Sequence, residues 1–277
     1  MSAGKDTSDR PFLKWVGGKR SLIEQFVPHL PRRFGRYHEP FMGSAALFFH
    51  LSPDTAYLSD NNERLVRTYK GLQKKPEEVI RHLSSYRYDR DFYLEMRRRP
   101  IDEAPDAELA AWFIYLNKTG YNGLYRVNSK NEFNVPFGKY KSPNFCNVDR
   151  LMACSRRLKG VKLDHGDFAS VTKRARAGDL VYFDPPYVPL SATSSFTSYT
   201  KHGFDIDDQT RLRDVALELV DAGVTVLVSN SASPVVRELY RARVFRHVEI
   251  WARRSINSKK EGRGAIGELL IKGGPRG

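Results

Sequence analysis

Four consecutive residues, Asp184-Pro185-Pro186-Tyr187, are the strongest candidates for chemistry. They follow the apolar run Leu180 to Phe183, which is typical of a buried parallel strand, and open α/β sheets bind ligands at the carboxyl ends of such strands. The Asp184 carboxylate and the Pro185 carbonyl could accept hydrogen bonds from both N–H groups of a conjugated amine such as that of adenine, favouring a pyramidal nitrogen as it attacks. Tyr187 could stack on the base. A bare four-residue match would more often be a rigid turn, but its position after this strand favours catalysis.

A second motif resembles a cofactor turn. The segment Glu39-Pro-Phe-Met-Gly43 leads from a short strand into a helix, and Asp60 ends the next strand. A glycine turn lets a ligand approach the backbone, and an acidic residue after the second strand can bind ribose hydroxyls. Each feature alone could equally be a tight turn or a helix cap. Their order predicts a cofactor site that includes Glu39, Pro40, Phe41, Gly43 and Asp60.

Two further pairs are weaker candidates. Trp15 and Lys19 flank a flexible Gly17-Gly18 pair, and a lysine there could bind a carboxylate-bearing ligand. The alternative is an ordinary N-terminal turn with Trp15 in the core. Asp167-Phe168 follows the strand at Val161 and could bracket an adenine ring, or could simply cap a helix.

Alternating strands and helices must position these residues. The chain opens with a βαβα pattern, and a helix around residues 212–219 connects the strand at 180–183 to a strand at 224–229. The segments 248–251 and 269–271 predict an antiparallel pair at the sheet edge. Between Lys70 and about Lys159 the pattern is helical and then loop-rich, with an amphipathic stripe at Leu109, Trp112, Phe113 and Leu116. We therefore expect an α/β domain with an inserted second domain.

Composition restricts the partners. The 46 Lys and Arg residues against 32 Asp and Glu give a formal net charge of +14, which suits a polyanion such as nucleic acid but also a generally basic surface. The two cysteines form no ligand or disulfide pattern, which fits a reducing cytoplasm. The seven histidines are scattered, so no metal site is expected. No signal peptide or membrane-spanning run is present in the sequence, so no membrane partner is expected.

Six motifs together resemble the Dam-type (D12 class) DNA adenine-N6 methyltransferases, and the likeness runs from about Pro11 to Glu268-Leu-Leu. They are Lys14-Trp-Val-Gly-Gly-Lys, Glu39-Pro-Phe-Met-Gly, Leu58-Ser-Asp-Asn-Asn, Gly120-Tyr-Asn-Gly-Leu-Tyr-Arg, Phe133-Asn-Val-Pro-Phe-Gly-Lys-Tyr and Asp184-Pro-Pro-Tyr. The resemblance implies a Rossmann-like S-adenosylmethionine-dependent methyltransferase sheet with a helical target-recognition insert. It implies S-adenosylmethionine as cofactor, S-adenosylhomocysteine as product, and GATC in double-stranded DNA as target. The implied division is a catalytic domain of residues 1–69 and 160–277 and a DNA-binding domain of residues 70–159.

The resemblance also assigns roles by matching position. It places the cofactor beside Trp15, Lys19, Glu39, Pro40, Phe41, Gly43, Asp60, Asp167, Phe168 and Asp184. It places the target base against Asp184, Pro185, Pro186 and Tyr187. Tyr121 and Asn122 would fill the gap left by a flipped adenine, and Arg126 would read a guanine. Other implied DNA contacts are Lys14, Leu124, Pro136 and Tyr140, and Ser191 to Thr200 would form a loop that closes on DNA.

Three positions depart from the family pattern. Ala45 stands where the family often has a second glycine, which bears on cofactor affinity, while Thr119 and Tyr125 vary the recognition segment and bear on strict GATC specificity. The expected reaction is an in-line displacement in which adenine N6 attacks the sulfonium methyl. The open alternatives are methylation of cytosine N4, RNA or a protein amide, and a catalytically silent DNA-binding module. A monomer, located in the bacterial nucleoid or a phage-infected cell, is the simplest expectation.

Overall fold

The computed structural model describes residues 10–15, 17, 19, 22–188, 204–252 and 266–275. The chain divides into two compact units. The first unit comprises Met1–Lys19, Met42–Ser52 and Ser59–Gly166, and the second comprises Arg20–Phe41, Pro53–Leu58 and Asp167–Gly277. The division at residues 70 and 159 that the resemblance implies stays a prediction.

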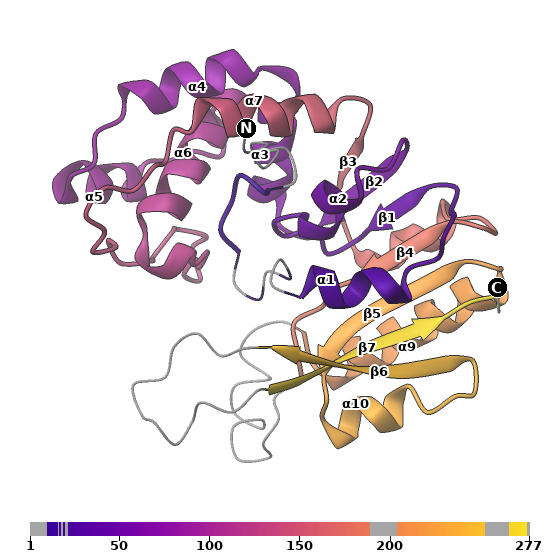
Figure 1. Ribbon diagram of the computed structural model, residues 1–277. Helices are drawn as coiled ribbons and strands as arrows, with labels where there is room; N and C mark the ends of the chain where they lie inside the picture. Colours follow the sequence, from indigo (N-terminus) through magenta and orange to yellow (C-terminus); the bar gives the residue numbers. More distant parts are fainter. Residues whose placement is uncertain are drawn as a thin grey trace, which may run out of the picture. The chain divides into compact units, whose positions relative to one another are not determined.

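Seven strands of the described chain form one mixed sheet (Figure 1), in the order β3-β2-β1-β4-β5-β7-β6. Strand β1 pairs in parallel with β2 and β4, β4 pairs in parallel with β5, and β7 runs antiparallel to both β5 and β6. This confirms the Rossmann-like α/β sheet and the antiparallel pair at its edge. The strands are β1 (Tyr37–Glu39), β2 (Ala56–Asp60), β3 (Lys162–His165), β4 (Leu180–Phe183), β5 (Thr225–Ser231), β6 (Phe245–Ala252) and β7 (Ile266–Gly273).

The strand order places a topological switch point between β1 and β4. The chain runs outward from β1 to β2 and β3, and then returns to the other side of β1 as β4. Ligands of doubly wound sheets bind beyond the carboxyl ends of the strands at this point. All four residues of β4 are buried, as the apolar run predicts for a central strand. The residues that follow β1 and β4 are therefore the first place to look for a site.

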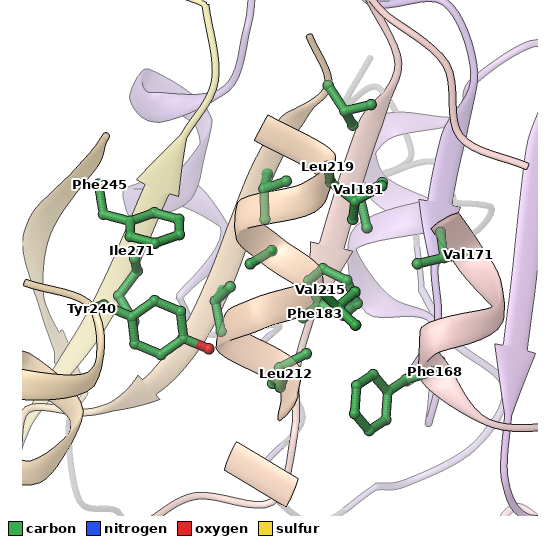
Figure 2. Packing of buried hydrophobic residues seen from close by; sticks show 14 of the residues in the cluster. Phe168, Val171, Val181, Phe183, Leu212, Val215, Leu219, Tyr240, Phe245 and Ile271 are labelled. Carbon is green, nitrogen blue, oxygen red and sulfur yellow. The ribbon is translucent and has the colours of Figure 1, made fainter. Parts of the chain in front are cut away.

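Helix α9 (Ile206–Asp221) covers β4 and β5 in the second unit. Figure 2 shows Leu212, Val215 and Leu219 of this helix packed against Val181 and Phe183. Burying each such side chain contributes about 1.5–3 kcal/mol. The helix begins with a capping box in which the Asp205 side chain accepts two backbone N–H groups. The unit also contains α1 (Ile23–Phe26), η3 (Val27–His29), η5 (Phe168–Lys173) and α10 (Pro234–Leu239).

The first unit is mainly helical in its described part, and α3 packs against α6 and α7. Helix α6 buries all four residues of the predicted stripe, but burial extends to eleven of its residues, beyond one amphipathic face. Trp112 on this helix donates from Nε1 to the Met96 carbonyl at 2.6 Å. The helices are α2 (Ala46–Leu51), α3 (Glu63–Lys74), α4 (Pro76–Ser85), α5 (Arg90–Arg98), α6 (Asp106–Thr119), η4 (Tyr121–Gly123) and α7 (Val148–Leu158).

Neither a membrane-spanning helix nor a metal-binding cluster occurs among the described residues. No helix there is long and apolar enough to cross a membrane. No group of three or more His, Cys, Asp or Glu side chains there could hold a metal ion.

Candidate active site and nucleic-acid interface

The end of β1 carries a buried carboxylate. Glu39 is only 3% exposed and accepts a hydrogen bond from the Tyr37 hydroxyl at 2.9 Å. Burial, and then the negative charge of Glu39, raises the pKa of Tyr37. On the neighbouring strand, burial and then Asp184 raise the pKa of Tyr182, with smaller contributions from Glu39 and Glu268. Burial and these carboxylates therefore keep the Tyr37 and Tyr182 phenols protonated.

Asp184-Pro185-Pro186-Tyr187 continues directly from β4. The Tyr187 hydroxyl donates to Glu268 Oε2 on β7 at 2.7 Å. Burial raises the pKa of Tyr187, and the charges of Asp184 and Glu268 add to the effect, so this phenol stays protonated at neutral pH. Pro185 is buried and Pro186 is exposed. The predicted catalytic segment thus begins on a central strand and is tied to β7.

Two predicted cofactor aromatics also meet within the second unit. The rings of Phe41 and Phe168 stack with centroids 5.3 Å apart and planes 24° apart. The guanidinium of Arg211 lies 4.3 Å from the Phe168 ring centroid, and it also binds both carboxylate oxygens of Asp167, at 2.9 and 2.6 Å. The hydrogen bond from Arg211 lowers the pKa of Asp167. Asp167 also caps η5 through the Ala169 N–H, which is the capping role that the sequence left open for it.

The first unit contains the glycine turn and the acidic residue after β2. Asp60 Oδ2 accepts from the Gly43 N–H at 3.1 Å, and Oδ1 accepts from the Asn62 N–H at 3.0 Å. Burial raises the pKa of Asp60, while these two backbone donors oppose the rise. Gly43 has φ of 44°, and a Cβ there would lie 2.7 Å from Cδ1 of Trp15. The turn therefore requires glycine and packs against the Trp15 indole.

Trp15 and Lys19 have well-defined surroundings. The Trp15 ring stacks with the rings of Phe113 and Tyr125, whose centroids lie 6.4 and 6.3 Å from its own. Lys19 is 5% exposed, and its ammonium group donates to the Gly17 carbonyl at 2.6 Å. Trp15 is thus part of an aromatic stack of the first unit as well as a neighbour of the glycine turn.

The predicted DNA contacts cluster within the first unit. The ammonium group of Lys14 lies 4.3 Å from the Tyr140 ring centroid, and the Tyr140 hydroxyl donates to the Gly120 carbonyl. Tyr121 is 53% exposed, and the exposed Asn122 adopts a left-handed backbone with φ of 55°. Asparagine adopts this conformation more readily than most non-glycine residues, so Asn122 suits the turn.

The remaining predicted contacts belong to the same cluster. The Pro136 carbonyl accepts from the Tyr121 N–H at 2.9 Å, and the Leu124 N–H donates to the Tyr121 carbonyl. Arg126 donates from Nε to Asn134 Oδ1 at 2.7 Å and from Nη2 to the Asn134 carbonyl at 3.2 Å. Asn134 therefore orients the guanidinium plane.

The two departures in the recognition segment are internal. Tyr125 stacks on Phe113 with centroids 5.0 Å apart, and the Thr119 hydroxyl donates to the Tyr115 carbonyl at 2.6 Å. The Tyr125 contact connects the predicted recognition loop to α6, whereas the Thr119 hydrogen bond lies within α6. Both side chains therefore make contacts within the protein, and their bearing on GATC specificity stays a prediction.

A basic cavity of about 230 Å³ was missed from the sequence. It is lined by Phe12, Lys118, Asn144, Phe145, Asn147, Arg150 and Leu151. Burial lowers the pKa of Lys118 to about 8, and the like charges of Arg150 and Lys14 add to this. Arg150 Nε is buried with no hydrogen-bond partner among the described residues. A lysine on the apolar helix α6 was the available signal, and an anion would complement this cavity.

Ser191 to Thr200, the predicted closing loop, lies outside the described residues.

Ala45 adopts φ of 50° and ψ of 40° at the start of α2, which is the left-handed conformation that glycine adopts without strain. This explains physically why a glycine would suit position 45.

Comparison with known proteins agrees with the motifs. Residues 15–256 match the family model of the D12 class N6 adenine-specific DNA methyltransferases. The type II methyltransferase M1.LlaDCHI of Lactococcus lactis subsp. cremoris is 42% identical over 270 residues, covering 95% of this chain and 94% of its own length. The type II methyltransferase M.MjaIII of Methanocaldococcus jannaschii is 40% identical over 285 residues, covering 95% of this chain and 98% of its own length. A DNA adenine methylase of Vibrio cholerae is 36% identical over 268 residues, covering 94% of this chain and 95% of its own length. The chain therefore belongs to the D12 class of N6 adenine-specific DNA methyltransferases.

Proposed function

We propose that this adenine-N6 DNA methyltransferase acts on GATC in duplex DNA and rotates the target adenine out of the helix before methyl transfer. The observation that carries the proposal is the position of Asp184-Pro185-Pro186-Tyr187 at the end of central strand β4, at the switch point. A base inside a duplex is out of reach of such a segment, which is why enzymes that modify bases extrude them.

The residues present suit the cofactor of this family, S-adenosylmethionine. Asp60 offers carboxylate oxygens held by the Gly43 and Asn62 N–H groups, in the position of a ribose acceptor. The partly exposed Phe41 ring, which stacks on the buried Phe168, offers an aromatic surface beside which an adenine ring would bind. Bound S-adenosylmethionine would supply an electrophilic sulfonium methyl. The other proposed cofactor contacts are Trp15, Lys19, Glu39, Pro40, Asp167 and Asp184.

The chain's own groups account for activation of the amine. The Asp184 carboxylate and the Pro185 carbonyl would accept the two N–H bonds of adenine N6, so that its lone pair is directed at the methyl group. Each such interaction contributes about 3 kcal/mol to catalysis when well placed. Tyr187, which stays protonated, would stack on the base. The proton leaves after the C–N bond forms, and no earlier general base is needed.

Recognition would come from the Tyr121 to Tyr140 cluster. Arg126 carries N–H donors that match O6 and N7 of guanine, a pairing worth about 1–3 kcal/mol of discrimination. Tyr121 and Asn122, both exposed, would occupy the gap left by the adenine. Lys118 and Arg150 line a cavity that suits a DNA phosphate. The net charge of +14 favours duplex binding through counterion release.

Methyl transfer from labelled S-adenosylmethionine to two duplexes that differ only in GATC versus GTTC tests the proposal. The modified nucleoside is identified by mass. N6-methyladenine confined to the GATC duplex is the expected result. Equal label in both duplexes would reject the specificity and keep the chemistry, and N4-methylcytosine would reject the assignment of the base.

A further inference from the structure

We propose that Gln209 and Asn230 are positioning residues that fix the backbone of the Asp184–Val188 segment, and with it the two acceptors for the adenine amine. This inference rests on the proposed role of Asp184 and Pro185. Neither amide side chain has any exposed surface, although one lies on α9 and the other on β5. Two fully buried amides beside a catalytic segment need partners, and here the segment itself supplies them.

The contacts form a short chain of hydrogen bonds. Gln209 Nε2 donates to the Pro186 carbonyl at 2.8 Å. Asn230 Nδ2 donates to Gln209 Oε1 at 3.0 Å. Asn230 Oδ1 accepts from the N–H groups of Val188, at 3.1 Å, and Ser231, at 2.8 Å. The amide pair therefore holds the segment at two points, one on each side of Tyr187.

Chemistry permits only one orientation of each amide. The Pro186 carbonyl can only accept, so the Gln209 NH₂ group must face it. The Val188 N–H can only donate, so the Asn230 carbonyl oxygen must face that group. The contact between the two side chains is then donor to acceptor without any choice. In each of these contacts a donor faces an acceptor. A buried hydrogen-bond network whose contacts are matched in this way is rigid.

The segment needs this support because its prolines cannot extend the sheet. Ladder pairing between β4 and β5 ends at Phe183 and Val228. Pro185 and Pro186 have no N–H to continue it. Gln209 lies one helical turn before Leu212, which Figure 2 shows on the buried face of α9. The packing of α9 therefore fixes the position of the Gln209 amide. Misplacing a reacting group by about 1 Å can cost about 100-fold in rate.

The test compares Gln209→Met and Asn230→Ala with Val215→Ala in the full chain. Val215 is buried on the same helix, so its truncation lowers stability through core packing alone. The measurements are thermal midpoint, dissociation constants for S-adenosylmethionine and a GATC duplex, and the single-turnover methyl-transfer rate. We expect the rate to fall about 10- to 100-fold in both amide variants while the dissociation constants change less than about threefold.

Val215→Ala should keep its rate within about threefold of the wild type despite a comparable loss of thermal stability. A rate loss in the amide variants no larger than in this control, or a loss confined to the dissociation constants, would overturn the inference. Gln209→Met adds no charge and preserves the side chain's length, so it decides the question even if Asn230→Ala does not fold.

Hydrogen exchange without substrate separates this inference from the proposed function. Between Asp184 and Val188 only three residues carry an exchangeable backbone N–H. The Val188 amide should exchange at least about tenfold faster in Asn230→Ala than in the wild type, because its acceptor is gone. Unchanged exchange would contradict the inference. If the wild type transfers no methyl group, but Val188 still exchanges faster in Asn230→Ala than in the wild type, the proposed function is refuted and the positioning role stands.

Discussion

Replacing Lys118 with methionine should stabilise the protein at neutral pH and lower its affinity for duplex DNA. Burial is the main cause that lowers the pKa of Lys118, from 10.5 to about 8, and the cationic Arg150 and Lys14 contribute to the shift. At about 1.36 kcal/mol per unit, this difference corresponds to a penalty of at most about 3 kcal/mol on the charged form in the folded state. Methionine fills similar space without the charge.

The sign of the pH dependence follows from linkage. Below pH 8 the lysine is protonated in both the folded and the unfolded states, so the penalty is fully present. Between pH 8 and 10.5 the unfolded state binds more protons, so the unfolding free energy of the wild type rises with pH relative to that of the variant. The advantage of Lys118→Met should therefore be largest at pH 7 and should disappear by about pH 10.5.

Urea unfolding at pH 7, 8, 9 and 10 measures this difference, and binding of a GATC duplex at several salt concentrations measures the cost. We expect the variant to bind more weakly, with a salt slope about one unit smaller, because the proposed phosphate contact of Lys118 is lost. Lys74→Met, at an exposed position on α3, is the matched control and should keep its stability. A variant less stable than the wild type at pH 7, or an advantage that does not decline with pH, would refute the reasoning.

Three more substitutions test the geometry. Gly43→Ala places a methyl group 2.7 Å from Trp15 in a left-handed turn, so the Michaelis constant for S-adenosylmethionine should rise about tenfold or more while the affinity for DNA is retained. Ala45→Gly relieves the left-handed backbone at φ of 50°, so the unfolding free energy from urea titration should rise by up to about 1 kcal/mol. Arg126→Ala should cost about 1–3 kcal/mol on GATC and less on duplexes in which its guanine is replaced, as kcat/KM across a substitution series would show. Equal losses on all duplexes would show that Arg126 binds only the backbone.

The sequence predicted the features that local patterns determine. The apolar run at 180–183, the capping cluster at Asp60 to Asn62 and the turn at Gly43 each carry a signal within a few residues, and the structure places them as expected. The family resemblance supplied the roles of the recognition residues.

The missed features depend on contacts between distant segments. Gln209 and Asn230 meet across 21 residues, and Asn230 reaches Val188 across 42. No periodicity marks such a pair, because each side chain alone looks like an ordinary polar residue on a helix or strand. The burial of α6 on nearly all sides arises in the same way, since α3, α4 and α5, which are distant in the sequence from one another, pack against it.

The most direct test of the proposed mechanism is single-turnover methyl transfer by Asp184→Ala, together with equilibrium binding of the GATC duplex and of S-adenosylmethionine. If Asp184 accepts a hydrogen bond from the adenine amine, losing about 3 kcal/mol of transition-state stabilisation lowers the rate by at least about 100-fold, while duplex binding changes little. A variant that transfers the methyl group at a rate near that of the wild type would contradict the account.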